Sequence, residues 1–87
     1  MTVAISKLRV PDYDRWAAQF AAGATSRAMF GVEVLSFGHD ASDRNIAVTI
    51  IRMESLEKLQ ALFANPTLQS NVEKEGIDVL DVTIVEN

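Results

Sequence analysis

The segment VEVLSFGHDASDRNIAVTIIRM, residues Val32–Met53, decides the fold of this 87-residue chain. It contains two extended apolar runs, Val32–His39 and Ile46–Met53. The polar stretch Asp40–Asn45 between them is dense in residues that favour turns. Apolar runs of this length on either side of a turn predict a β-hairpin.

The charges at one end of the hairpin indicate its register. If His39 lies opposite Ile46, Glu33 lies opposite Arg52, so that opposite charges meet at the far end. The same register gives two further pairs, Phe37 with Val48 and Leu35 with Ile50. We therefore expect Glu33 and Arg52 to form a structural cross-strand pair.

A strand and a helix are predicted before the hairpin. Thr2–Val10 is rich in β-branched residues and stops at Pro11, so we expect it to be the first strand. One long helix should follow, capped by Asp12 and ending near Gly31, where a glycine can adopt the left-handed conformation. Its apolar face recurs at helical spacing and comprises Tyr13, Trp16, Ala17, Phe20, Ala24 and Ala28.

A helix and a strand are predicted after the hairpin. Ser55 can cap a helix with an apolar stripe at Leu56, Leu59, Leu62 and Phe63. Asn65 and Pro66 end that helix and begin a shorter one, which closes at Gly76. Ile77–Val85 alternates between apolar and polar residues and should be the last strand.

The order strand, helix, hairpin, helix, strand predicts an α+β, ferredoxin-like βαββαβ domain spanning residues 1–87. Both helical crossovers should cover one face of a four-stranded antiparallel sheet. We expect the uncovered face to carry Val32, Val34, Ala47, Thr49, Ile51, Met53 and Val85. Because so apolar a face is not left in water, the sequence predicts a homodimer that joins two sheet faces around a two-fold axis.

Composition excludes several classes of function. Eight Lys and Arg against twelve Asp and Glu give a net charge of -4, and the basic residues are scattered, so we expect no nucleic-acid partner. The absence of cysteine excludes disulfides and thiolate sites, and a single histidine makes a metal site unexpected. No apolar run approaches the roughly 20 residues of a membrane span, and no export signal is visible, so we expect a cytoplasmic protein.

Two residues are candidates for catalysis. His39, the one histidine, adjoins the polar turn and can act as a general acid or base, or can be an exposed residue at a strand end. Arg27 falls within the apolar stripe of the first helix. Its guanidinium can hold a carboxylate, a phenolate or a developing oxyanion of a ligand, pair with an acidic residue of the fold, or reach solvent from the helix end.

Other residues are candidates for ligand binding. Tyr13, Trp16 and Phe37 can wall an aromatic pocket or pack in the core. Asn45 can orient a substrate oxygen or fix the geometry of the turn. Asp81 should project from the last strand into the dimer seam or the barrel interior, as a base or as the partner of a basic residue such as Lys7 or Arg9.

These features resemble small members of the dimeric α/β-barrel superfamily, which includes antibiotic-biosynthesis monooxygenase-like and cyclase-like proteins. The matching positions are Val10–Trp16, Arg27 before Gly31, Asp43–Asn45, and Asn65–Leu68 leading to Glu75–Ile77. The resemblance implies a ferredoxin-like subunit that dimerises through its sheets, with a cavity between sheet and helices or near the seam. The sequence departs from the pattern at Ser6 and Lys7, where relatives often have histidine, and at Arg44, where they often have proline.

The resemblance leaves the reaction open, because the superfamily includes cofactor-free oxygenation of polycyclic phenols, haem breakdown, polyketide cyclisation and isomerisation. One hypothesis is an enzyme without a bound cofactor that acts on an aromatic or polyketide-like small molecule. A second is a non-catalytic ligand-binding or stress-response homodimer. A third is a structural domain without a cavity.

Overall fold

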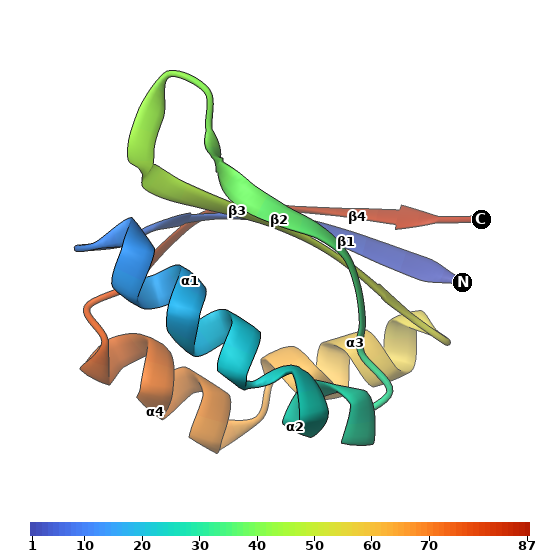
Figure 1. Ribbon diagram of the computed structural model, residues 1–87. Coiled ribbons are helices and arrows are strands. Elements are labelled where there is room, and N and C mark those ends of the chain that lie inside the picture. Colours follow the sequence, from blue (N-terminus) through green and yellow to red (C-terminus); the bar gives the residue numbers. More distant parts are fainter.

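A computed structural model describes residues 1–87 as one antiparallel sheet with helices on one face (Figure 1). The elements are β1 (Thr2–Arg9), α1 (Tyr13–Ala22), α2 (Ala24–Met29), β2 (Glu33–Asp40), β3 (Asp43–Met53), α3 (Leu56–Phe63), α4 (Pro66–Lys74) and β4 (Asp78–Glu86). The strand order is β2-β3-β1-β4, so β1 and β3 are central and β2 and β4 are edges. The predicted α+β, ferredoxin-like fold is confirmed.

The first crossover differs from the single helix that was predicted. Asp12 caps α1 as expected, since its Oδ1 accepts a hydrogen bond of 3.2 Å from the Arg15 backbone N–H. The helix is divided at Gly23, a residue type that disfavours helix interiors. At the same point the Arg27 side chain donates a hydrogen bond to the Phe20 carbonyl. The prediction of one continuous helix is therefore wrong, although Gly31 adopts the predicted left-handed conformation, with φ 76°.

The second crossover follows the predicted capping. Ser55 caps α3 by accepting a hydrogen bond from the Lys58 N–H, and Asn65 caps α4 by accepting from the Thr67 N–H. Pro66 occupies the first turn of α4, where the backbone N–H that proline lacks would have no partner within the helix. Gly76, with φ 67°, leads the chain out of α4 towards β4.

The turn of the hairpin is shorter than predicted. β2 continues to Asp40 and β3 begins at Asp43, so that only Ala41 and Ser42 lie between the strands. The Asp40 carboxylate accepts hydrogen bonds of 2.8 Å from both the backbone N–H and the hydroxyl of Ser42. These bonds, the backbone one first, lower the pKa of the Asp40 carboxyl.

The predicted register is right at one end of the hairpin and wrong at the other. Glu33 lies opposite Arg52, and the two form an ion pair of 2.6 Å. Beyond Val34 an irregularity at Leu35 shifts the pairing, because a bulge inserts one unpaired residue. The observed partners are Ser36 with Ile50, Phe37 with Thr49 and His39 with Ala47.

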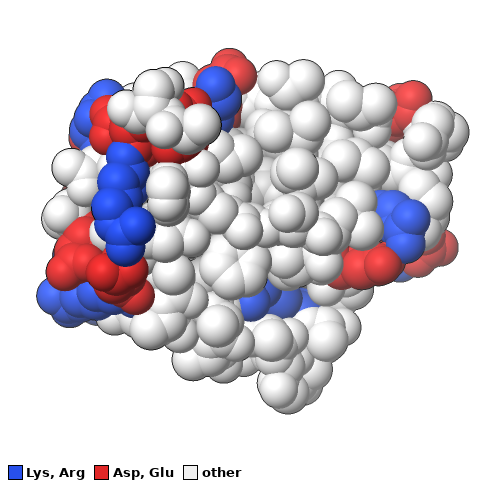
Figure 2. Space-filling view, turned by 45° about the horizontal axis from the view of Figure 1, so that its top comes forward, with Lys and Arg blue, Asp and Glu red and all other residues white.

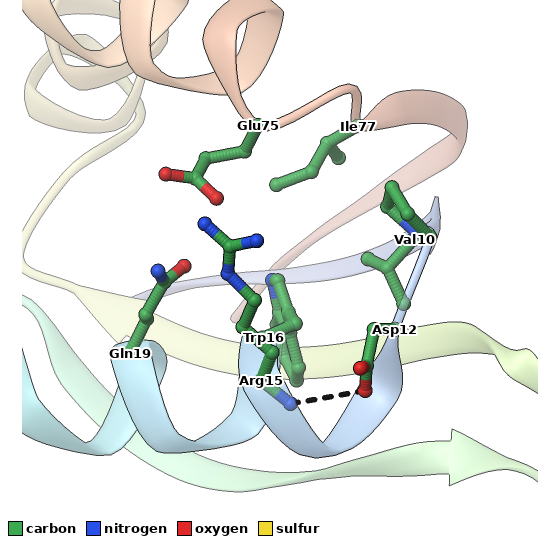
Figure 3. A pocket seen from close by; sticks show the side chains of 8 residues that line it. Val10, Asp12, Arg15, Trp16, Gln19, Glu75 and Ile77 are labelled. Atoms are coloured by element: carbon green, nitrogen blue, oxygen red, sulfur yellow. Dashed lines mark hydrogen bonds between the residues drawn. The ribbon is translucent and has the colours of Figure 1, made fainter.

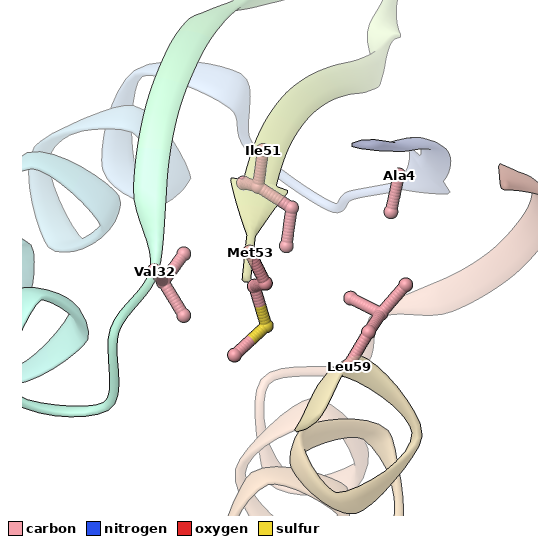
Figure 4. Close-up of a cluster of buried hydrophobic side chains, with 5 residues drawn as sticks. All are labelled: Ala4, Val32, Ile51, Met53 and Leu59. Carbon is pink, nitrogen blue, oxygen red and sulfur yellow. The ribbon is translucent and has the colours of Figure 1, made fainter. Parts of the chain in front are cut away.

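Two buried clusters lie between the sheet and the helices. The larger contains Ala4, Val32, Ile51, Met53 and Leu59, the last two reaching towards each other from β3 and α3 (Figure 4). The smaller contains Val10, Trp16 and Ala47. The small side chains of Ala4 and Ala47 are fully buried, which leaves room for Leu59 and Trp16 to pack against the sheet.

These clusters correct the predicted faces of the sheet. The residues expected on the uncovered face that instead lie on the side of the helices are Val32, Val34, Ala47, Thr49, Ile51 and Met53. β3 is apolar on both faces, so alternation along the strand did not show which face the helices would cover. Val85 does lie on the uncovered face, because it is opposite Val3.

The uncovered face is nevertheless apolar, as expected. We call it the open face; its uncharged residues are Val3, Ile5, Ser36, Gly38, Ile46, Val48, Ile50, Thr83 and Val85. Figure 2 turns this side of the molecule partly forward and shows a largely uncharged middle, with most charged residues gathered at two ends. One end holds the pair Glu33–Arg52, and the other holds Arg9 within 3.7 Å of Asp43, with Lys7 opposite Asp81 nearby. None of the helices has the length and apolar character needed to cross a membrane.

Candidate functional site

Five ring side chains form a continuous row between α1 and β2, which we call the aromatic row. Tyr13, Trp16 and Phe20 come from one face of α1, and Phe37 and His39 come from one face of β2. The ring centroids of Trp16 and Phe20, and those of Phe20 and Phe37, lie 4.9 Å apart. The His39 ring meets Tyr13 edge-on at 5.0 Å. Ring pairs at these distances stabilise the folded protein by more than the burial of their surface alone.

Part of the aromatic row is accessible from outside. Trp16 is only 8% exposed, whereas Tyr13 and Phe20 are half-buried and Phe37 is 40% exposed. The exposure follows from the position of β2 at the edge of the sheet, where no further strand covers it. A planar ring can therefore stack on the outer side of the row without displacing Trp16.

Arg27 lies at one end of the aromatic row. Its guanidinium carbon is 3.8 Å from the centroid of the Phe20 ring, and its Nη2 donates to the Phe20 carbonyl. Its Nε is buried without a hydrogen-bond partner, and burial lowers the pKa of the guanidinium. The four ion pairs of the structure involve other residues, so no carboxylate balances its charge. Arg27 thus retains the capacity to hold an anion.

His39 lies at the opposite end of the aromatic row. Its Nδ1 is 2.9 Å from the Asp40 carbonyl oxygen. A carbonyl only accepts, so Nδ1 carries the proton of the neutral ring and Nε2 carries the free electron pair. Nε2 lies 3.5 Å from Nη1 of Arg44. Nε2 is therefore the atom that can take a proton from a substrate.

Arg44 is a residue that the candidate list from the sequence lacks. Its Nη2 forms a hydrogen bond of 2.6 Å with the Asp14 carboxylate, and its guanidinium carbon lies 5.3 Å from the Tyr13 ring centroid. The pairing joins residues 30 positions apart, which no local pattern identifies. Its one signal in the sequence was the departure from the superfamily pattern at this position.

The remaining candidates lie away from the aromatic row. Asn45 is exposed; its backbone N–H bonds the Asp43 carboxylate and its carbonyl accepts from Val10, which agrees with a structural role near the turn. Asp81 lies on the open face opposite Lys7 and accepts a 3.4 Å hydrogen bond from the hydroxyl of Thr83. Neither shares a contact with Arg27 or His39.

Arg27 and His39 do not line a common enclosed cavity. The rings of Tyr13, Trp16 and Phe20 stand between them. A hollow of about 50 Å³ lies instead beside Trp16, between the start of α1 and the end of α4 (Figure 3). A broader open groove of about 460 Å³ lies near the two termini and the start of α3. No three residues among His, Cys, Asp and Glu are grouped to hold a metal ion.

The chain is thus a ferredoxin-like domain in which α1 and the edge strand β2 enclose a row of aromatic side chains, with the Arg27 guanidinium at one end of the row. The sequence matches no protein-family model and no curated protein. Among solved structures, it is similar to a proposed antibiotic biosynthesis monooxygenase from Deinococcus radiodurans, with a TM-score of 0.71, 14% identity, and coverage of 100% of this chain and 92% of that one. The likeness confirms the ferredoxin-like fold that the resemblance implied.

Proposed function

We propose that this protein is a small-molecule enzyme of the cofactor-free monooxygenase-like or cyclase-like kind, acting on an aromatic or polyketide-like substrate. The observation that carries this proposal is the accessible aromatic row with the unbalanced charge of Arg27 at its end. The shared fold with a proposed monooxygenase supports it. A planar aromatic substrate also suits the row, because aromatic side chains stack on planar rings at little conformational cost.

Each residue of the row has a proposed role. Phe37, Tyr13 and Trp16 support the rings of the substrate, and Arg27 holds a phenolate oxygen as negative charge develops. His39 Nε2 takes a proton from the substrate. Because His39 and Arg27 lie at opposite ends of the row, the substrate that engages both has several fused rings.

The oxygenation balances without a cofactor when the substrate supplies the electrons. For an anthrone, the base removes a proton from the ring methylene, and the resulting anion reduces dioxygen. One oxygen atom remains on that carbon as a new carbonyl. The other leaves as water with the two hydrogens of the methylene, so the product is the anthraquinone.

We propose that the working form is a homodimer joined through the open face and located in the cytoplasm. The face is apolar around Val3, Ile5 and Ile50, and each end carries both basic and acidic residues, Lys7 and Asp81 among them, so a two-fold arrangement can match unlike charges (Figure 2). A domain of this size also has a thin core, and burying a second face against a partner adds stability.

One observation favours a second function, a non-catalytic ligand-binding or stress-response dimer. His39 is exposed, and three rings of the row separate it from Arg27. A ligand held at the Arg27 end alone would then meet no base. Such a protein would bind an aromatic anion without turning it over.

Oxygen uptake with 1,8-dihydroxyanthrone and no added cofactor distinguishes the two functions. The enzyme consumes oxygen and forms the anthraquinone; we expect Arg27→Gln and His39→Gln each to slow this by at least about 100-fold. Lys74→Gln removes an exposed cation of α4 outside both the row and the open face; it is the control and should keep the wild-type rate. Binding of the phenol without oxygen uptake contradicts oxygenation and supports the cyclase-like or the non-catalytic function, and uptake that neither variant slows contradicts the assigned roles.

A further inference from the structure

The hollow between α1 and α4 has an apolar floor and a charged rim. The floor is formed by Val10, Trp16 and Ile77, of which Val10 is 2% exposed. The space open to the centres of water molecules is about 50 Å³. One water requires about 10–15 Å³ of such space, so the hollow accommodates roughly three to five water-sized groups. A molecule of a few non-hydrogen atoms fits it, and a polycyclic substrate does not.

The rim of the hollow brings together charges of opposite sign. Arg15 and Gln19 come from successive turns of α1, and Glu75 comes from the end of α4. Figure 3 shows the Arg15 guanidinium and the Glu75 carboxylate facing each other across a gap, with the Gln19 amide beside them. The two charged groups form no ion pair with each other or with another residue. The Asp12 carboxylate, also on the rim, accepts from the Arg15 backbone N–H.

We infer that this hollow is a binding site for a small zwitterion, a free amino acid of the size of glycine. The Arg15 guanidinium presents paired donors that match a carboxylate, and Glu75 presents an acceptor for an ammonium group. The Gln19 amide can donate or accept beside them. The aliphatic carbon of the ligand lies on the floor of Val10, Trp16 and Ile77.

Two-ended recognition follows from the unpaired rim charges. A simple carboxylate such as acetate satisfies Arg15 but meets repulsion from Glu75. Methylammonium satisfies Glu75 but meets repulsion from Arg15. Only a molecule that carries both charges within a few bonds satisfies the two residues together. The site shares Trp16 with the aromatic row but uses neither Arg27 nor His39, so it does not depend on the proposed function.

Calorimetric titration of the wild-type protein with glycine tests the inference. We expect millimolar binding, in keeping with the small size of the ligand, and at least about tenfold weaker binding of acetate and of methylammonium. Phenylalanine, which exceeds the hollow, should not bind. Glycine should also shift the NMR signals of the Gln19 side-chain amide, which places the ligand at this rim.

Matched variants separate this site from other charged surfaces. Arg15→Gln and Glu75→Gln should each weaken glycine binding by at least about tenfold. Lys74→Gln and Glu73→Gln each remove one charge from α4 outside the hollow and should leave glycine binding unchanged, as should Arg27→Gln. Circular dichroism checks that all variants fold. The inference is overturned by the absence of heat and of NMR shifts, by acetate or phenylalanine binding as tightly as glycine, or by Glu75→Gln binding glycine normally.

Discussion

Val48→Asp is expected to separate the proposed dimer into folded subunits. Val48 lies within the open face, paired with Lys7 on β1 and with Gly38 on β2. Full burial of a valine side chain contributes about 1.5–3 kcal/mol, but Val48 is already half-buried within the subunit, so association adds about 0.5–1 kcal/mol per copy. A two-fold interface contains the residue twice and would also bury two unpaired carboxylates, each at a cost of several kcal/mol, so the substitution removes at least about 3 kcal/mol of association free energy. Because about 1.4 kcal/mol changes an equilibrium constant tenfold, the dissociation constant should rise by at least about 100-fold.

Sedimentation velocity at low micromolar concentration measures this change. The wild-type chain should sediment as a dimer and Val48→Asp as a monomer, with circular dichroism showing the same secondary structure in both. Val79→Asp is the matched control, because Val79 is 55% exposed and lies opposite Leu8, away from the open face. A wild-type monomer, or a Val48→Asp dimer as tight as the wild type, would refute the reasoning.

Three further predictions concern the subunit itself. Leu59→Ala removes a side chain with 0% exposure and should lower the free energy of unfolding in urea by about 2–5 kcal/mol, whereas Leu68→Ala, 37% exposed, should cost clearly less; equal losses would contradict the assigned core. Gly31→Ala forces φ 76° on a side chain and should destabilise by about 1–2 kcal/mol, while Gly38→Ala, also in open space but without positive φ, should not. In an NMR titration the Asp40 carboxyl should have a pKa below 3.8, and a pKa at or above 3.8 would disagree. The stability that its hydrogen bonds give the turn should be present above the usual aspartate range and be lost as pH falls through the lowered pKa.

The local signals of the sequence predicted the outline of the fold. Asp12, Ser55 and Asn65 act as helix caps because capping depends on one side chain and the next few backbone N–H groups. Gly31 and Gly76 adopt positive φ for an equally local reason. The order of elements, and with it the ferredoxin-like topology, followed from these boundaries.

Which face of the sheet the helices cover could not be predicted from the strand sequences alone. β3 places Ile46, Val48 and Ile50 on one face and buried residues on the other, so either face looks fit for a core. A physical signal was present in the small size of Ala4 and Ala47, which allows bulky helix residues to approach. The bulge at Leu35 has no signal of this kind, and it moved Phe37 and His39 by one position in the register.

The candidate site was predicted in part. Tyr13, Trp16 and Phe37 do come together, because spacing on α1 and alternation on β2 set them on facing sides. These rings lie between His39 and Arg27, an arrangement that depends on how α1 crosses β2 and that only the tertiary structure shows. The roles of these residues in catalysis stay predictions, as does the cytoplasmic location.

Quenching of Trp16 fluorescence tests the central claim, that the aromatic row binds an aromatic anion through Arg27. Trp16 is the single tryptophan of the chain and lies within the row, so its emission responds to a ligand that stacks there. Titration with 1,8-dihydroxyanthraquinone should quench the wild-type protein and the Lys74→Gln control equally. Arg27→Gln should bind at least about tenfold more weakly, through loss of a charge-assisted contact. Saturable quenching that is the same in Arg27→Gln, or no quenching in the wild type, would contradict the account.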